Sequence, residues 1–447
     1  MKFLRYISLC MILPASLCIG AQTMSLDSCL ALAHRHSAAS SNAEIDVAVA
    51  QETKNQLFTK YFPQVQAMAI GFYSLNPMID LGIDDIKNAG VRDILNMFYA
   101  NYGAALGIDK SFTLLQHGTM AGVMAMQPVF VGGQIVNGNK LAQVGVEAAR
   151  RQQQVVNRRI DADIEEAFWL VYGLEQKQRV LETVRSMLLS IGDDVRNAVE
   201  AGLAIANDQL QVEIRQNDVA SKMLSVESGL RLAKWALCQS MGIQMTDSFD
   251  ILAPEHFMAV MPSQRVEAEA VIERPELQLL QLNLQAEQLR KRIAIGEALP
   301  SLMVGAGYSY NNLLNKNAHN GTVFFTAKVP LTAWWETSSK IRQHDLLIRK
   351  AANQQSDYFE KMELETRRAW NELNEAYRQL GIIGRTVDNA KENLRISQLN
   401  YNAGLITLSE YLQSQSLYAQ TLDQQSDART RFLICEHKYQ RLTGKSY

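Results

Sequence analysis

Apolar and polar positions follow two different periods along this chain of 447 residues. In four runs, at about 64–75, 119–130, 301–311 and 322–331, apolar residues alternate with small or polar ones, as in strands whose two faces meet different surroundings. Elsewhere apolar residues recur every three or four positions over long stretches, which is the spacing of helices. The pattern predicts an α+β chain that combines long helices with four strands.

The predicted helices are very long. About 70 residues between the second strand and Gly202 contain no proline, and a helix of that length would reach roughly 100 Å at the α-helical rise per residue. After Gly202, apolar residues recur in steps of four and three, as in the seam of a coiled coil. These residues are Val219, Met223, Val226, Leu230, Ala233 and Leu237. Shorter helices are predicted over 38–62 and 275–298, each before a strand pair.

The chain contains the same plan twice. Each landmark of the first half recurs 202 positions later: Pro128 as Pro330, Gly202 as Gly404, and Gly242 as Gly444. We therefore predict one structural repeat over 22–243 and a second over 263–447, joined by an irregular linker over 244–262. The first repeat carries about 35 additional residues, roughly 76–117, between its two strands. This insertion contains a helix-like stretch over 91–102.

The beginning of the chain has the layout of a cleaved signal peptide over 1–21. Lys2 and Arg5 precede an apolar run over 7–19, and small residues follow. Cys18 follows a leucine, so a lipid anchor is not predicted. Without the signal peptide the net charge is about −4, so the composition does not indicate a protein that binds nucleic acid. The mature chain keeps three widely spaced cysteines, which predict neither a disulfide framework nor a zinc site.

The four strands have the length and pattern of strands that cross a lipid bilayer. In the third strand Val304, Ala306 and Tyr308 share one face, whereas Gly305 and Gly307 lie on the other. Each run is about as long as the 9 to 11 residues that a tilted membrane strand requires. A soluble sheet with one buried face would show the same alternation. Export and strand length favour the membrane interpretation.

Two similar turns interrupt the long helical stretches. The chain has EAGLAIANDQL from Glu200 and NAGLITLSEYL from Asn402. A glycine just after a helix favours a positive φ and lets the chain reverse. The spacing of Thr407 and Glu410 predicts a capping box for the following helix, and in the first copy Asn207 is the expected cap. On a purely structural interpretation, the leucine after each glycine packs back on the preceding helix.

These features together resemble the TolC-like outer-membrane channel family. They are a signal peptide, two repeats with a strand pair and a helical hairpin in each, and an Ala-Gly-Leu turn with an acidic residue six positions after the glycine. The resemblance implies a homotrimer whose four transmembrane β-strands per subunit complete a twelve-stranded β-barrel in the outer membrane. An α-helical coiled-coil tunnel would extend from it into the periplasm.

The resemblance also implies partners and functional residues. Such a channel passively conducts cargo from an inner-membrane transporter of RND, ABC or MFS type, through a periplasmic adaptor protein, in efflux or type I secretion. The turn residues match its adaptor contacts: Ala201, Gly202, Leu203, Ala403, Gly404 and Leu405. Tyr401 and Asp208 match residues that hold the periplasmic gate closed, and Glu410 is the remaining acidic residue at the aperture. Two positions depart from the family, because Ile406 replaces an arginine and Gln413 an aspartate.

Other chemistry receives little support. The seven histidines are scattered, no catalytic constellation occurs, and no enzymatic activity, cofactor or metal site is predicted. Met68, Met120, Met124 and Met126 raise the question of a path for soft metals. We assign them to the lipid-facing side of the strands as apolar filler. The alternative function is a periplasmic coiled-coil scaffold or adhesin without channel activity.

Overall fold

A computed structural model describes residues 22–76, 78–108, 110–114, 117–252, 259–264, 267–312 and 316–444. The predicted signal peptide, 1–21, lies outside these residues. Within them, no helix combines the length and apolar character that crossing a bilayer requires.

The chain forms two compact units. The first contains Met1–Ala48, Ala149–Gln281 and Gln354–Tyr447, and the second contains Val49–Ala148 and Leu282–Asn353. Each unit therefore combines segments from before and after the predicted linker. The two sequence repeats are interleaved in space rather than folded as separate bodies.

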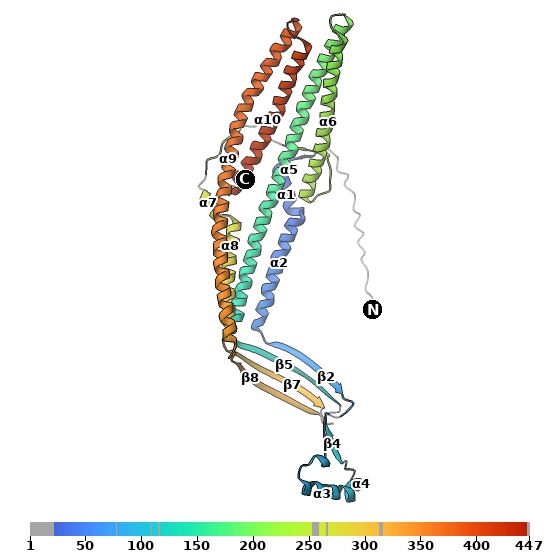
Figure 1. The fold of residues 1–447 in the computed structure, drawn as a ribbon, viewed down its shortest axis with the longest axis vertical. Coiled ribbons are helices and arrows are strands. Elements are labelled where there is room, and N and C mark those ends of the chain that lie inside the picture. The colour runs from blue at the N-terminus through green and yellow to red at the C-terminus, as the bar shows by residue number, and fades with distance from the viewer. Residues whose placement is uncertain are drawn as a thin grey trace, which may run out of the picture. The chain divides into compact units, whose positions relative to one another are not determined.

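Helical hairpins dominate the first unit. Helix α5 (Gln134–Glu200) turns into α6 (Ala206–Met241), and α9 (Ala333–Asn402) turns into α10 (Leu408–Leu442) (Figure 1). Helices α5 and α9 contain 67 and 70 residues and continue into the second unit. The shorter helices are α1 (Leu26–His36), α2 (Ala38–Phe58), α7 (Glu267–Ile272) and α8 (Pro275–Glu297).

The predicted seam of α6 forms the buried side of that helix. Val219 and Leu237 are 7% and 0% exposed, and Leu230 and Ala233 are also buried. They belong to two apolar clusters, in which residues of α5 and α6 pack with residues of α10. The corresponding side of α10 is more polar in sequence but is buried at Phe432 as well. Packing between helices therefore stabilises both hairpins.

The predicted irregular linker contains a short strand, which the sequence did not indicate. Strand β6 (Phe249–Ile251) pairs in parallel with β1 (Gln22–Met24). Phe249 and Ile251 are buried, and the buried ammonium group of Lys234 donates a hydrogen bond to the carbonyl of Phe249. A strand of three residues is too short to produce a recognisable alternation. The prediction of a wholly irregular linker is therefore wrong.

The second unit contains an antiparallel sheet in the order β2-β5-β7-β8 (Figure 1). Its strands are β2 (Gln64–Tyr73), β5 (His117–Val131), β7 (Ser301–Asn312) and β8 (Ala318–Lys328). The four predicted strands are confirmed, although β8 begins and ends earlier than expected. Pro330 lacks the N–H that a longer strand would use in its ladder.

The insertion after β2 has its own small elements. Strands β3 (Ile79–Gly82) and β4 (Ser111–Leu114) pair with each other. Between them in the chain lie α3 (Ala89–Phe98), a π-helical turn (Tyr99–Gly103) and α4 (Ala104–Leu106). The predicted helical stretch is confirmed. It begins earlier than expected because the side-chain oxygen of Asn88 accepts a hydrogen bond from Val91 N–H at 3.3 Å.

The strand register places the methionines on the other face of the sheet. Met68 lies opposite Gly122, and Gly122 lies opposite Ser309 of β7. Residues that face each other across neighbouring strands share a side, so Met68 and the even-numbered methionines of β5 lie with the small and polar residues. Val304 and Tyr308 lie on the opposite, apolar face. The assignment of these methionines to the apolar, lipid-facing side is therefore wrong.

Candidate functional site: the turns of the helical hairpins

The two Ala-Gly-Leu turns have the same backbone geometry. Gly202 and Gly404 have φ values of +72° and +71°. In the first turn Leu203 N–H donates to Ala198 O at 2.8 Å and Gly202 N–H donates to Val199 O at 3.0 Å. The second turn repeats both bonds 202 positions later. This is a Schellman motif, and the predicted helix-ending role of both glycines is confirmed.

All six turn residues are exposed. Leu203 and Leu405 are 84% and 74% exposed, so the expectation that they pack back on the preceding helix is wrong. A Cβ atom added at Gly202 or Gly404 would meet no atom within 4 Å. Each turn therefore presents an apolar side chain and an open backbone without a partner inside the subunit.

Different residues begin the helices after the two turns. The carboxylate of Glu410 accepts hydrogen bonds from Thr407 N–H at 2.8 Å and from its hydroxyl at 3.0 Å, and Thr407 Oγ1 accepts from Glu410 N–H. These bonds hold the pKa of Glu410 below its usual range and confirm the predicted capping box. In the first copy the carboxylate of Asp208 accepts from Ile205 N–H at 3.4 Å. The prediction that Asn207 caps this helix is wrong.

Tyr401 of α9 contacts the other helix of its own hairpin and packs against the apolar cluster that joins the two hairpins. Its ring stacks on that of Tyr411, with centroids 5.4 Å apart and an interplanar angle of 17°. Burial and the negative charges of Asp208 and Asp194 raise the pKa of the Tyr401 hydroxyl. Asp208 of the first hairpin therefore acts electrostatically on Tyr401 of the second. Among the described residues, however, no direct hydrogen bond joins the two.

The two departures from the family pattern have different surroundings. Ile406 is partly buried and packs against the apolar cluster that contains Val195, Val212 and Tyr411, from both hairpins. Gln413 is exposed. Apolar packing therefore occupies the place where the resemblance implies an arginine.

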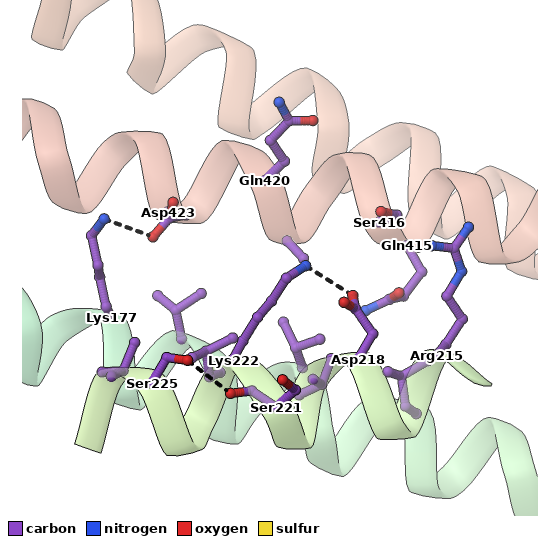
Figure 2. A pocket seen from close by; sticks show the side chains of 17 residues that line it. Lys177, Arg215, Asp218, Ser221, Lys222, Ser225, Gln415, Ser416, Gln420 and Asp423 are labelled. Atoms are coloured by element: carbon purple, nitrogen blue, oxygen red, sulfur yellow. Dashed lines mark hydrogen bonds and ion pairs between the residues drawn. The ribbon is translucent and has the colours of Figure 1, made fainter. Parts of the chain in front are cut away.

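A groove of about 470 Å³ separates part of the first hairpin from α10 (Figure 2). Across it, Lys177 Nζ of α5 lies 3.4 Å from Asp423 Oδ1 and 2.9 Å from Asp427 Oδ1. Lys222 instead pairs with Asp218 of its own helix, at 2.9 Å. Lys177 therefore joins the two hairpins electrostatically, whereas Lys222 does not.

Sequence reasoning missed Tyr411 and the Lys177 cluster. Asp423 and Asp427 are four residues apart on α10 and so lie on one face of the helix. Like charges at this spacing repel unless a cation lies near them. The pair of aspartates was therefore the feature of the sequence that indicated a nearby cation. Lys177, about 250 positions earlier, could not be assigned as that cation from spacing alone.

Comparisons with known proteins agree with this architecture. Residues 268–445 match the family model described as Outer membrane efflux protein. Outer membrane protein TolC of Vibrio cholerae is 23% identical over 270 residues, which cover 57% of this chain and 61% of the relative. The match therefore spans less than two thirds of that relative.

Solved structures of similar fold cover nearly the whole chain. VceC from Vibrio cholerae has a TM-score of 0.75 at 14% identity, over 94% of this chain and 96% of that one. The Campylobacter jejuni CmeC outer membrane channel has a TM-score of 0.75 at 12% identity, over 94% and 86%. The Neisseria gonorrhoeae MtrE outer membrane channel has a TM-score of 0.74 at 12% identity, over 94% and 89%.

Paired helical hairpins and a four-stranded sheet form an architecture that this chain shares with these solved outer-membrane proteins. Residues 268–445 of the chain belong to the outer membrane efflux protein family. The location of the chain is the outer membrane.

Proposed function

We propose that the chain is the outer-membrane subunit of a tripartite efflux or type I secretion assembly, and that it conducts cargo passively. The observation that carries this proposal is the pair of exposed turns. Each hairpin ends in a rigid Schellman motif whose leucine has no partner in the subunit. Exposed apolar side chains on a rigid backbone are suited to binding another protein. We assign a periplasmic adaptor to these turns, and to the adaptor an inner-membrane transporter of RND, ABC or MFS type.

The subunit is proposed to work as a homotrimer. Within the described residues, the four-stranded sheet ends at β2 on one side and at β8 on the other. A sheet that spans a bilayer leaves no unpaired edge in lipid, because the free N–H and C=O groups have no water to bond. Pairing β8 of one copy with β2 of the next would close twelve strands from three copies. The insertion between β2 and β5 would then face outward.

The test is reconstitution. Purified full-length protein should be a trimer in detergent by light scattering and should give discrete conductance steps in planar bilayers. A scaffold or adhesin would fractionate away from outer membranes and give no conductance. A monomer with intact strand signal in circular dichroism would contradict the proposed assembly.

Tyr401, Asp208 and Glu410 are proposed to surround the periplasmic aperture. The support is the effect of the Asp208 charge on the pKa of Tyr401 and the position of Glu410 at the start of α10, after the turn. The combined variant Tyr401→Phe, Asp208→Ala should show higher single-channel conductance than the wild type. Unchanged conductance would assign closure to other contacts between the hairpins.

A further inference from the structure

Five methionines form a continuous ladder on one face of the sheet. Met120, Met124 and Met126 lie on one face of β5, with Gly122 between the first two, and Met68 of β2 lies opposite Gly122. Met126 lies opposite Gly305 of β7, and Met303 comes two residues before Gly305 on the same face. The ladder therefore runs across three strands.

Each step of this ladder is within reach of two methionine side chains. Positions two apart on one strand are about 7 Å apart, and diagonal neighbours on paired strands are about 7–8 Å apart. Methionine has three rotatable bonds before its terminal methyl group, so neighbouring sulfur atoms can approach each other. The order along the ladder is Met120, Met68, Met124, Met126 and Met303.

A hollow gives these side chains room to move. It has a volume of about 490 Å³, and Met68, Met120 and Met124 line it together with Gly122 and Gly307. Gly122 lies opposite Met68 and Gly307 lies opposite Met124, so the position directly across from each of these methionines carries no side chain, although Phe324 also lines the hollow. Met68 and Met120 are 60% and 40% exposed, which leaves the sulfur atoms accessible.

We propose that this methionine ladder binds soft monovalent cations, Cu(I) or Ag(I), through its thioether sulfurs. Thioethers select soft cations, whereas carboxylates and imidazoles favour other metals. The described strand residues of this face contain no Asp, Glu, His or Cys, so the face lacks the charged, imidazole and thiolate ligands that hold most divalent ions. Successive neutral ligands of similar strength suit a cation that passes from one to the next.

Apolar packing alone does not account for the methionines. Their face is mixed: it carries the polar residues Gln66, Ser309 and Thr322 as well as Ile70, Phe72 and Phe324, whereas the opposite face is mainly apolar, with residues such as Val123, Val304 and Phe325. A role for the ladder along the conduction path rests on the proposed channel function. The binding of the cation does not.

The test uses full-length protein in detergent and Ag(I) nitrate in chloride-free buffer, because Ag(I) is a redox-inert probe. The buried thiols of Cys29, Cys238 and Cys435 would also bind Ag(I), so all variants carry alanine at these positions. Equilibrium dialysis compares Met68→Leu, Met124→Leu with the control Met97→Leu, which removes a 67%-exposed thioether on α3. The ladder variant should bind Ag(I) at least tenfold more weakly, since loss of even an outer-shell partner costs roughly tenfold or more. Equal Ag(I) binding by the ladder variant, the Met97→Leu control and the cysteine-free parent protein would overturn the proposal.

A second measurement leaves every cysteine in place. In protein labelled with ¹³C at the methionine methyl groups, Ag(I) should shift the resonances of Met68, Met120 and Met124 and leave Met97 unchanged. Shifts confined to other methionines would overturn the proposal. In planar bilayers, Ag(I) should interrupt the current of the wild type but not of the ladder variant. Ag(I) binding by a protein that gives no conductance would support the ladder and contradict the channel function. Conductance together with Ag(I) binding that the ladder substitutions do not weaken would support the channel function and contradict the ladder.

Discussion

Replacement of Lys177 by methionine should favour the open state of the channel. Lys177 joins α5 to Asp423 and Asp427 of α10, so opening that separates the hairpins must break both ion pairs. The lysine side chain is 27% exposed and the two aspartates are about half exposed, so each pair contributes only a few tenths of a kcal/mol to 1 kcal/mol. About 1 kcal/mol per subunit gives about 3 kcal/mol in a symmetric trimer, or roughly a hundredfold change in the closed-to-open ratio.

The assay is the open probability of single channels in planar bilayers at low and high salt. The wild type should open more often as salt rises, because ions screen these pairs, and Lys177→Met should lose most of this dependence. Lys222→Met is the matched control: it lines the same groove, but its partner Asp218 is on the same helix. Equal behaviour of the two variants would refute the assignment of closure to contacts between the hairpins.

Three further predictions concern other parts of the chain. Gly404→Asp should lower the free energy of unfolding by about 1 kcal/mol, because aspartate disfavours the positive φ of this position. Trimers should still form in light scattering, because no atom of the subunit lies near the added side chain, whereas export by cells should be lost. Lys234→Met should lower the free energy of unfolding by about 3–5 kcal/mol, since it leaves the buried Glu175 unpaired, and adding Glu175→Leu should restore much of the loss in denaturant titrations. Burial lowers the pKa of His437 to about 4, so its unfolded state binds a proton first and stability should fall as pH drops from 6.5 towards 4. His437→Phe should show a shallower decline over this range, and an identical profile would contradict the argument.

The features that the sequence predicted well are local. Alternation over about ten residues identified the four strands, and a glycine followed by a T-x-x-E spacing identified the turn at Gly404 and the cap at Glu410. Each of these depends on side chains within one turn or one strand. Their physical causes are therefore visible in a short stretch of sequence.

The features that were missed depend on how distant segments pack. The face of Met68 follows from its register with β5, which a single strand does not specify. The stack of Tyr401 on Tyr411 requires the geometry of the whole turn between two helices. Lys177 meets its aspartates only after two hairpins have docked. The exposure of Leu203 likewise depends on what the rest of the subunit leaves uncovered.

The open edges of the sheet have a genetic consequence. Because the four-stranded sheet ends at β2 and at β8, each copy in the proposed trimer would rely on both neighbours to complete its backbone pairing. A subunit with an altered edge would spoil every assembly that it enters. If defective and normal subunits were made equally and mixed at random, only about one assembly in eight would contain three normal copies. A substitution in β2 or β8 that spares folding should therefore be dominant over the wild-type allele.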